Sequence, residues 1–279
     1  MSVFPGDIQV AIESTLSDQV LSATPVRGGD INQAFRLELS SKRSVFAKVH
    51  QSAPPGMFKS EAHGLSMLRH GPLRVPCVLA QDERFLILED LGAGVPNQSH
   101  DETLGRGLAA LHQTRSQLAG CSDAPGYIAT LSIDNTRTSW TNFYLGRLQN
   151  LIQRAGLDAK RVTRFQVAIP RLRSLLEGAP IALLHGDLWR GNVHTDSRGA
   201  PCLVDPSSYF GDPEVDLAMM HLFGGFSTHV FDAYDEVLPP RPGSALRRGV
   251  YQLYPVLVHL LLFGGAYLGQ VDSLLSNLE

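Results

Sequence analysis

A polar loop enclosed by two short apolar runs constrains the fold of this chain more than any other feature of its sequence. The loop reads HGDLWRGN over residues 185–192; it follows the apolar run IALL and precedes a second apolar run, CLV, which ends at Asp205. Asp187 and Asn192 stand five residues apart within the loop. This order predicts a strand, a loop and a strand, with Asp187, Asn192 and Asp205 gathered together.

Two carboxylates and one carboxamide in this arrangement suit phosphoryl transfer. In-line transfer needs a carboxylate near the attacking hydroxyl and oxygen ligands for magnesium, which bridges the phosphates and offsets their charge. Kinase catalytic loops supply an Asp followed five residues later by an Asn. The pattern therefore predicts that Asp187, Asn192 and Asp205 hold a phosphoryl donor and its metal; the alternative is a turn of solvated acids.

Bulk composition indicates a globular protein. The chain has 279 residues, of which 43% are hydrophobic and 18% charged, enough for one large domain or two lobes. The formal charge of −3 gives no electrostatic argument for nucleic acid or for a membrane surface. Three widely spaced cysteines argue against a disulfide framework and against a cysteine-built zinc site.

The two segments that could direct the chain to a membrane do not have the required pattern. The N-terminus has acidic residues early and no basic segment before an apolar block, so we expect no signal peptide. The longest apolar stretch, residues 254–269, is interrupted by Pro255 and His259 and is shorter than the roughly 20 residues of a membrane helix. A buried helix and a cytoplasmic location are the expectations.

The first third of the chain carries strand patterns and the rest helical ones. Helical spacing predicts helices over 7–22 and 59–70. Alternation predicts strands over 35–39, 44–50 and 85–90, the last in a hairpin with its turn at 81–84. Beyond residue 92, helical periodicity covers 101–116, 141–156, 159–178, 214–226 and 247–263. We therefore expect a small antiparallel-sheet lobe with one main helix over residues 1–91 and a mostly helical lobe over 92–279.

A lysine and a glutamate in the first lobe are candidate nucleotide contacts. Lys48 lies on an alternating strand whose other face is apolar, and Glu61 lies on the next predicted helix. Such a pair can fix an ammonium group against phosphates. Lys–Glu pairs are also common on solvated surfaces, and Lys42 and Lys59 compete for the role. The order of the elements favours Lys48.

Two backbone segments are further nucleotide candidates. Gly28 and Gly29, in RGGDINQAF, would let backbone N–H groups approach an anion, although a simple hairpin turn is the alternative. The backbone of Glu89, Asp90 and Leu91 follows a strong apolar strand and could meet an adenine edge as a hinge. The alternative there is only a buried strand.

Several residues near the polar loop are candidates for its support or for substrate contact. Asp216 opens an apolar helix, where its carboxylate would hold the backbone of the loop. Asp212 and Glu214 precede or begin the same helix and are either caps or substrate contacts. Trp189 either stacks on a sugar or packs, and His185 is expected to orient the loop rather than to bind metal.

Four segments together resemble one known family: GGDINQAF, LLHGDLWRGNV, VDPSSYFGDPEVDLAMMHLFGGF and YQLYPVLVHLLLFGGAYLGQ. They closely resemble the fructosamine kinase, or ketosamine-3-kinase, family, from about residue 8 to the C-terminus and in the family's order. GDLWxGNV with the downstream DxEVDLAMxxLFGGF is specific to it, whereas HGDxxxxN…D alone indicates only an aminoglycoside-phosphotransferase-like kinase.

The resemblance implies an α+β, bilobal, protein-kinase-like fold and an activity. The family uses ATP and Mg²⁺ to phosphorylate O3 of the ketose in fructosamines or ribulosamines, after which the adduct breaks down and frees the amine. The implied role is deglycation of proteins or free amines.

The resemblance also assigns roles to the candidate residues. Asp187 is the implied catalytic base and Asn192 and Asp205 are the magnesium ligands. Lys48 is the phosphate contact with Glu61 as its partner, and the segment from Glu89 to Leu91 is the ATP hinge.

The chain departs from the family at three places. Asp30 stands where Cys is frequent, so no thiol-based switch is expected at that loop, and Asp30 brings negative charge near the phosphates. Arg190 stands where Gly is frequent, and YIATLSIDN, residues 127–135, lacks the usual Gly. The substrate side is therefore less closely matched than the nucleotide side.

Three alternatives stay open beside a ketosamine kinase. The first is an aminoglycoside-, choline- or other small-molecule phosphotransferase of the same fold, which the GDLW and LFGGF segments disfavour. The second is a nucleotide-binding pseudokinase, against which the full set of transfer residues argues. The third is a metal-dependent hydrolase, which the lack of clustered His and Cys makes the weakest. A small-molecule or protein-bound ketosamine is the expected partner; the sequence does not predict an oligomeric state.

Overall fold

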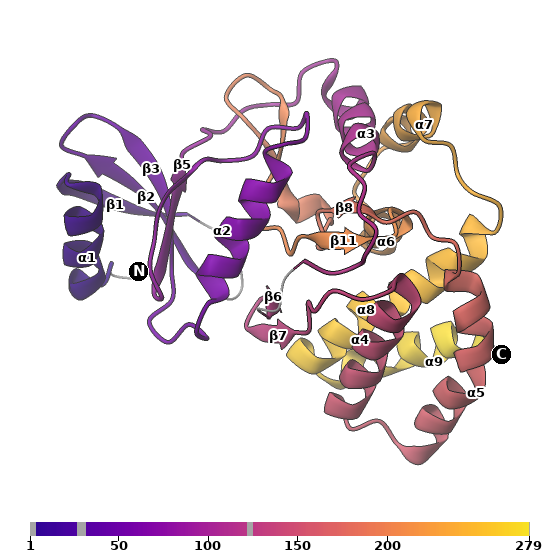
Figure 1. The fold of residues 1–279 in the computed structure, drawn as a ribbon. Helices are drawn as coiled ribbons and strands as arrows, with labels where there is room; N and C mark the ends of the chain where they lie inside the picture. Colours follow the sequence, from indigo (N-terminus) through magenta and orange to yellow (C-terminus); the bar gives the residue numbers. More distant parts are fainter. Residues whose placement is uncertain (1–3, 27–31, 122–124, 279) are drawn as a thin grey trace.

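A computed structural model describes residues 4–26, 32–121 and 125–278 of the chain. Within these ranges, a five-stranded antiparallel sheet lies at one end of the molecule and most of the helices lie at the other (Figure 1). The sheet order is β1-β2-β3-β5-β4. Its strands are β1 (Val20–Val26), β2 (Gln33–Leu39), β3 (Ser44–Val49), β4 (Val78–Gln81) and β5 (Phe85–Glu89).

Two helices cover opposite faces of this sheet. The helix α1 (Gly6–Leu16) packs Ile8 and Ile12 against the face that carries Phe35 and Leu37. The helix α2 (Met57–Leu68) packs against the face that carries Leu86 and Leu88, and it separates the sheet from the rest of the molecule (Figure 1). Side chains alternate between the faces of a strand, and Lys48 pairs in register with Leu86. Lys48 therefore points toward α2 while its neighbours Ala47 and Val49 face α1.

The predicted elements of this region are confirmed except at the first helix. The strands over 35–39, 44–50 and 85–90 and the helix over 59–70 appear close to their expected limits. The predicted helix over 7–22 is wrong beyond Leu16. Ser17 adopts a left-handed conformation with φ 51°, and Glu13 Oε1 accepts a hydrogen bond from the backbone N–H of Val20 at 2.9 Å. The left-handed Ser17 ends the helix, and the hydrogen bond between Glu13 and Val20 holds the first residue of β1.

The remainder of the chain is mostly helical, as expected. Its helices are α3 (His100–Leu111), α4 (Trp140–Arg154), α5 (Ala159–Leu176), α6 (Glu214–Phe223), α7 (Thr228–Val237), α8 (Ser244–Phe263) and α9 (Leu268–Ser276). Helices α7 and α9, which have only 10 and 9 residues, are not among those predicted from the sequence. In the described part of the chain, every helix is too short or too polar to cross a bilayer.

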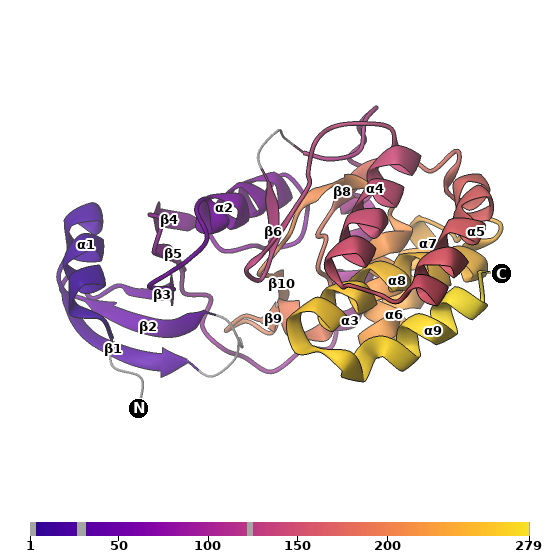
Figure 2. The same cartoon turned by 90° about the horizontal axis from the view of Figure 1, so that it is seen from below.

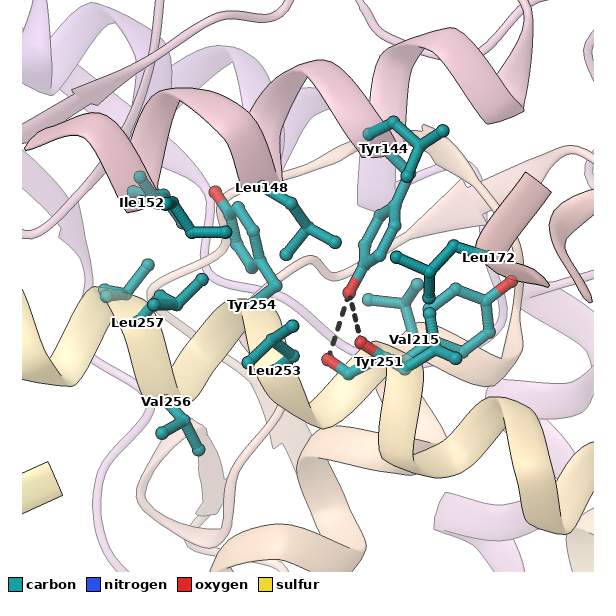
Figure 3. Close-up of a cluster of buried hydrophobic side chains, with 14 of the residues drawn as sticks. Tyr144, Leu148, Ile152, Leu172, Val215, Tyr251, Leu253, Tyr254, Val256 and Leu257 are labelled. Carbon is teal, nitrogen blue, oxygen red and sulfur yellow. Dashed lines mark hydrogen bonds between the residues drawn. The ribbon is translucent and has the colours of Figure 1, made fainter. Parts of the chain in front are cut away.

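The core of this helical region explains how α8 tolerates a proline. Pro255 lies inside α8 and has no N–H to donate to the carbonyl of Tyr251, one turn earlier. The hydroxyl of Tyr144, which projects from α4, donates to the carbonyl oxygens of Tyr251 at 3.2 Å and Val250 at 3.1 Å (Figure 3). Tyr144 therefore satisfies the acceptor that proline leaves free, and it fastens α4 to α8.

Small two-stranded ladders accompany the helices; Figure 2 shows β9 and β10 on the side that faces the sheet and β8 beside α4. The strand β8 (Ala182–Leu184) pairs with β11 (Tyr209–Gly211), and β9 (Val193–Thr195) pairs with β10 (Pro201–Leu203). The short ladder β6 (Gly126–Ile128) and β7 (Leu131–Ile133) and the 3₁₀ turns η1 (Arg190–Asn192) and η2 (Gly265–Tyr267) complete the elements. The predicted strand–loop–strand is thus present as β8, the loop with η1, β9 and β10.

Candidate active site

The loop that follows β8 is fixed by one buried carboxylate. Asp216, in the first turn of α6, accepts hydrogen bonds from the backbone N–H of His185 at 2.8 Å and of Gly186 at 2.9 Å. Gly186 has φ 83°, and a Cβ there would lie 2.1 Å from the carbonyl oxygen of Ser207, so only glycine fits. Helix α6 therefore sets the position of the polar loop, the supporting arrangement that the sequence predicts for Asp216.

Asp216 stays ionised despite its burial. His112 Nε2 lies 3.2 Å from Asp216 Oδ2, and His112 Nδ1 lies 2.8 Å from the hydroxyl of Tyr234. Burial alone would raise the pKa of Asp216, but the hydrogen bonds from His112 and Gly186 and the nearby imidazole of His185 hold the pKa below its ordinary value. The loop is thus supported by a fixed negative charge.

His185 lies inside the loop and holds its two sides. Its side chain is fully buried; Nε2 is 2.9 Å from the carbonyl oxygen of Val204, and Nδ1 accepts from the backbone N–H of Asp187 at 3.3 Å. Burial lowers the pKa of His185, which favours the neutral ring. In this tautomer the imidazole connects the Asp187 backbone to the chain just before Asp205.

Asp187 and Asn192 are joined directly across the loop. Asn192 Nδ2 donates to the carbonyl oxygen of Asp187 at 2.7 Å and to its Oδ2 at 3.1 Å. Burial, followed by the negative charges of Asp205 and Asp216, raises the pKa of Asp187 to about 7, although the hydrogen bond from Asn192 opposes the rise. Because the amide nitrogen of Asn192 is used in this way, its Oδ1 is the atom left to bind a ligand.

A lysine of the sheet reaches the same place. Lys48 Nζ lies 2.6 Å from Glu61 Oε1 of α2 and also forms an ion pair with Asp205 Oδ1. Burial disfavours the ammonium, but the charges of Asp205 and Glu61 outweigh burial and raise the pKa of Lys48. Asp205 has φ 55° and a side chain that is 45% exposed. The structure therefore brings Lys48, Glu61, Asp187, Asn192 and Asp205 together, which sequence distance alone could not show.

The segment predicted as a hinge is held by its acidic side chains. Glu89 accepts hydrogen bonds from Arg74 Nη2 at 2.6 Å and from the backbone N–H of Cys77 at 3.2 Å. Asp90 accepts from Ser44 Oγ at 2.7 Å and from the backbone N–H of Gly92 at 3.0 Å. The side chains of Glu89 and Asp90 therefore stabilise the segment through hydrogen bonds within the chain.

The hinge backbone keeps one open donor. The Leu91 carbonyl accepts from the backbone N–H of Ser197 at 3.2 Å, whereas the Leu91 N–H has no hydrogen-bond partner in the described ranges. This N–H is available to a ligand. Gly28, Gly29 and Asp30 lie outside the described residues.

Asp212 and Glu214 have internal partners and do not face an open cleft. Asp212 is fully buried; Oδ2 accepts from Arg241 at 2.5 Å and from the Tyr251 hydroxyl at 2.6 Å, while Oδ1 caps the N–H of Glu214 at 3.0 Å. Glu214 forms two hydrogen bonds of 2.7 Å with Arg247. Their placement does not support the substrate-contact interpretation, because partners within the chain use the carboxylate oxygens.

Trp189 is the predicted residue that remains open to solvent. Its side chain is 43% exposed, and a Cβ on Gly191 would lie 2.2 Å from its indole ring. The absence of a side chain at Gly191 therefore lets the ring lie flat over the loop. This exposed aromatic face is available to a sugar, and nothing in its position requires packing alone.

Sequence reasoning missed the partners that lie far away in the chain. Arg241, Arg247, Tyr251 and His112 hold Asp212, Glu214 and Asp216 from 27 to 104 positions away. One signal was present: Arg247 and Tyr251 stand four residues apart, so they share a face of an otherwise apolar helix. A polar pair on a buried face needs buried partners.

Comparison with known proteins identifies the family of this chain. The fructosamine kinase family model matches residues 6–279. A probable ketoamine kinase of Enterococcus faecium is 37% identical and covers 95% of this chain and 99% of its own. A chloroplastic protein-ribulosamine 3-kinase of Oryza sativa is 32% identical and covers 93% of this chain and 79% of its own.

Solved structures show the same fold. One from Thermobifida fusca, provisionally assigned as a fructosamine-3-kinase, superposes with a TM-score of 0.86 at 31% identity over 99% of both chains. An ADP-bound aminoglycoside phosphotransferase superposes with a TM-score of 0.63 at 13% identity over 98% of both chains. The predicted α+β, protein-kinase-like fold is therefore confirmed. By its family match and by relatives that span nearly its whole length, this chain belongs to the fructosamine kinase family.

Proposed function

We propose that this chain transfers the γ-phosphoryl group of ATP to the O3 hydroxyl of a ketosamine, a fructosamine or a ribulosamine, in deglycation of proteins or free amines. The observation that carries the proposal is the meeting of Lys48, Asp187, Asn192 and Asp205 at one place. Relatives named ketoamine kinase and protein-ribulosamine 3-kinase supply the acceptor class. The cleft then lies between a nucleotide lobe, residues 1–91, and a catalytic lobe, residues 92–279.

The free atoms of the site fit magnesium and a nucleotide. Asp205 uses Oδ1 on Lys48, and its Oδ2 has no partner among the described residues. Asn192 Oδ1 is likewise without a partner in the described chain, as is the N–H of Leu91. Carboxylate and amide oxygens are the ligands that Mg²⁺ prefers, and an open backbone N–H suits an adenine nitrogen. Asn192 and Asp205 would hold the metal, and Leu91 would hold the base.

The chemistry then follows from what each residue can do. ATP supplies the phosphoryl group, and magnesium offsets the charge of the phosphate oxygens. Asp187 holds Asn192 with Oδ2, so Oδ1 orients the O3 hydroxyl and accepts its proton as the oxygen attacks phosphorus. Lys48 balances negative charge on the phosphates, and Glu61 keeps the ammonium in place. Trp189 offers its exposed ring to the ketose.

The experiment that tests the function reads donor, acceptor and position together. Purified protein is incubated with Mg-ATP and either ribulosyl-lysine or fructosyl-lysine, and products are analysed by mass spectrometry and by phosphorus–proton NMR coupling. We expect one phosphate on O3 of one or both ketosamines. We also expect no product from Asp205→Asn, while its melting curve stays cooperative.

Two results would favour the alternatives. Faster turnover of an aminoglycoside or of choline than of either ketosamine would make this chain a small-molecule phosphotransferase with another acceptor. Thermal stabilisation by Mg-ATP with no turnover of any acceptor would make it a nucleotide-binding pseudokinase. Phosphate on a hydroxyl other than O3 would keep the kinase and reject the proposed regiochemistry.

A further inference from the structure

A histidine, a methionine and a cysteine converge beside α2, away from the residues used above. His63 Nε2 lies 3.2 Å from Cys121 Sγ, and the same sulfur lies 3.4 Å from the thioether sulfur of Met67. His63 is exposed, while Met67 and Cys121 are partly buried, so the group is open to solvent on one side. Cys121 is a free thiol.

The fold holds these three side chains from two directions. His63 and Met67 are four residues apart and project from the same face of α2. Cys121 comes from the other side of the molecule; its N–H donates to the carbonyl of Asn135 at 3.0 Å, and the preceding Gly120 pairs with Phe210. The Cys121 thiol is therefore fixed by backbone hydrogen bonds, and it meets two donors fixed by one helix.

Close packing keeps α2 at that distance. A Cβ added to Gly64, next to His63, would lie 3.3 Å from the Pro206 side chain and 3.4 Å from Ser208 Oγ. The helix therefore lies directly on the chain that follows Asp205. The position of α2 is thus held by its packing on Pro206 and Ser208, independently of the three side chains themselves.

We propose that His63, Met67 and Cys121 form a binding site for a soft monovalent metal ion, copper(I). Thiolate and thioether sulfur are the protein ligands that select copper(I), and imidazole is compatible with them. On binding, the Cys121 thiol releases its proton to solvent, and a sulfur–metal bond forms without any change of oxidation state.

The observed spacing suits such an ion. Metal bonds of about 2.3 Å to sulfur and 2.0 Å to nitrogen, at tetrahedral to trigonal angles, separate the ligand atoms by roughly 3.5–4 Å. The observed separations of 3.2 and 3.4 Å need to open by only a few tenths of an ångström. An exposed imidazole and an unbranched thioether can make that movement.

Zinc fits the same group poorly. Structural zinc takes four ligands from Cys, His, Asp and Glu, and thioether sulfur is not among them. Of the three donors, only His63 and Cys121 would serve zinc. The presence of Met67 is therefore the feature that points to copper(I).

Binding would tie the two lobes together. His63 and Met67 share α2 with Glu61, the partner of Lys48, whereas Cys121 belongs to the helical region. A metal bridge would restrain α2 against that region. The proposal does not depend on the kinase assignment, because its measurement is metal binding.

The test is an anaerobic titration of the whole chain with copper(I) buffered by a competing chromophoric chelator. Wild type is expected to bind one copper(I) per chain. Cys121→Ser should weaken binding on the order of 100-fold, and Met67→Leu and His63→Gln by about tenfold each. Cys77→Ser and Met57→Leu are matched controls, a thiol and a thioether elsewhere, and should bind as wild type does. Melting curves establish that each variant is folded.

Three results would overturn the site: wild type binding no copper(I), Cys121→Ser binding as tightly as wild type, or Met67→Leu leaving the affinity unchanged. X-ray absorption at the copper edge gives an independent check. Two sulfur neighbours and one nitrogen neighbour are expected in wild type, and one sulfur fewer in Met67→Leu. Two nitrogen neighbours with a single sulfur in wild type would reject the assigned ligands.

Discussion

Two clusters of charged side chains in this protein have similar chemistry but differ in whether their carboxylate oxygens have hydrogen-bond partners within the chain. The cleft cluster comprises Lys48, Glu61, Asp187 and Asp205, and the support cluster comprises Asp212, Glu214, Arg241 and Arg247. In the cleft cluster, Oδ1 of Asp187 and Oδ2 of Asp205 have no partner within the described chain. In the support cluster, Arg241, Arg247, Tyr251 and a backbone N–H engage the carboxylate oxygens.

The difference separates function from stability. Buried polar groups are normally satisfied, because an unsatisfied one costs free energy. The open oxygens of the cleft cluster are not buried unsatisfied groups, and the Asp205 side chain is 45% exposed, so they are free to bind a ligand. Groups with perturbed pKa values gather at such places. The support cluster, by contrast, fixes the start of α6, from which Asp216 holds the loop of Asp187. Substitutions in the cleft cluster should therefore lower kcat, whereas substitutions in the support cluster should lower the free energy of unfolding.

The largest expected effect is on catalysis, from Asp187→Asn. Asparagine keeps the shape and the hydrogen bond to Asn192 but cannot accept the proton of the attacking hydroxyl. We expect kcat to fall by about 10²–10⁴-fold, the range for loss of a general base. Initial rates with a ketosamine and Mg-ATP measure it. A fall in kcat of less than about threefold would show that Asp187 is not the general base, and that the cleft cluster is not distinguished from the support cluster by catalysis.

The same variant should gain stability at neutral and higher pH. The folded-state pKa of Asp187, about 7, lies above its ordinary value of 3.8. The group therefore favours folding below pH 4, and this contribution is lost as pH rises through 7. Asparagine carries no charge, so we expect Asp187→Asn to unfold at a higher temperature than wild type at pH 8. The difference should shrink at pH 5.

The next prediction concerns the support cluster. Glu214→Ala leaves Arg247 without its acid and should lower the free energy of unfolding by about 3–5 kcal/mol, as expected when one partner of a buried ion pair is removed. Denaturant unfolding measures the change. Protein that remains folded should keep most of its kcat, because Glu214 does not face the open cleft.

A matched pair of variants sharpens this result. Replacing both partners, Glu214→Leu with Arg247→Met, should recover part of the lost stability, since no buried charge is left unpaired. Loss of kcat to the level of Asp187→Asn in well-folded Glu214→Ala would show that the two clusters are not separable.

A further prediction is the pH dependence of kcat/KM, which reports on the free enzyme. Because the base works only when ionised and its pKa is raised to about 7, kcat/KM should fall tenfold per pH unit well below pH 7. A profile measured from pH 5 to 8.5 tests it. Glu214→Gln should keep the same midpoint. An acidic limb centred near pH 4 would mean that Asp187 is not held in the buried state seen here.

The sequence predicts the cleft cluster better than the support cluster, for a physical reason. Catalytic chemistry restricts residue type and local spacing, so Asp187, Asn192 and Asp205 can be recognised within a stretch of 19 residues. The support partners are chosen by packing alone. Arg247, on α8, and Arg241, in the loop before α8, reach Glu214 and Asp212 only because α8 lies beside α6. No local pattern encodes that contact.

The secondary structure is likewise predicted where it follows local periodicity and missed where it depends on distant contacts. Helix α2 and strands β2, β3 and β5 follow from their periodicity, whereas the first helix ends at Ser17 because of a single left-handed residue that propensity does not mark. The pairing of β8 with β11 rather than with β10 depends on segments brought together by the whole domain. The burial of Asp212 likewise depends on Arg241 and Tyr251, 29 and 39 positions away, and cannot be read from the local sequence.

The smallest effect on stability is expected from Tyr251→Phe, which removes the hydrogen bond donated to Asp212 and the one accepted from Trp140 Nε1 at 3.2 Å. The hydroxyl of Tyr251 donates to Asp212 at 2.6 Å, but Arg241 and the Glu214 N–H remain as partners of that carboxylate. The buried N–H of Trp140 loses its acceptor, so the free energy of unfolding should fall by about 1–3 kcal/mol, and the melting temperature by several degrees. Calorimetry measures the shift, and kcat should be unchanged.

Tyr267→Phe is the matched control, because the Tyr267 hydroxyl has no hydrogen bond among the described residues. We expect it to melt as wild type does. A loss of kcat in Tyr251→Phe greater than its loss of stability explains would mean that the support cluster adjusts Asp216, and through it Asp187, during turnover. The distinction between a satisfied structural cluster and an open catalytic one would then fail at the residue where the two are joined, the first turn of α6.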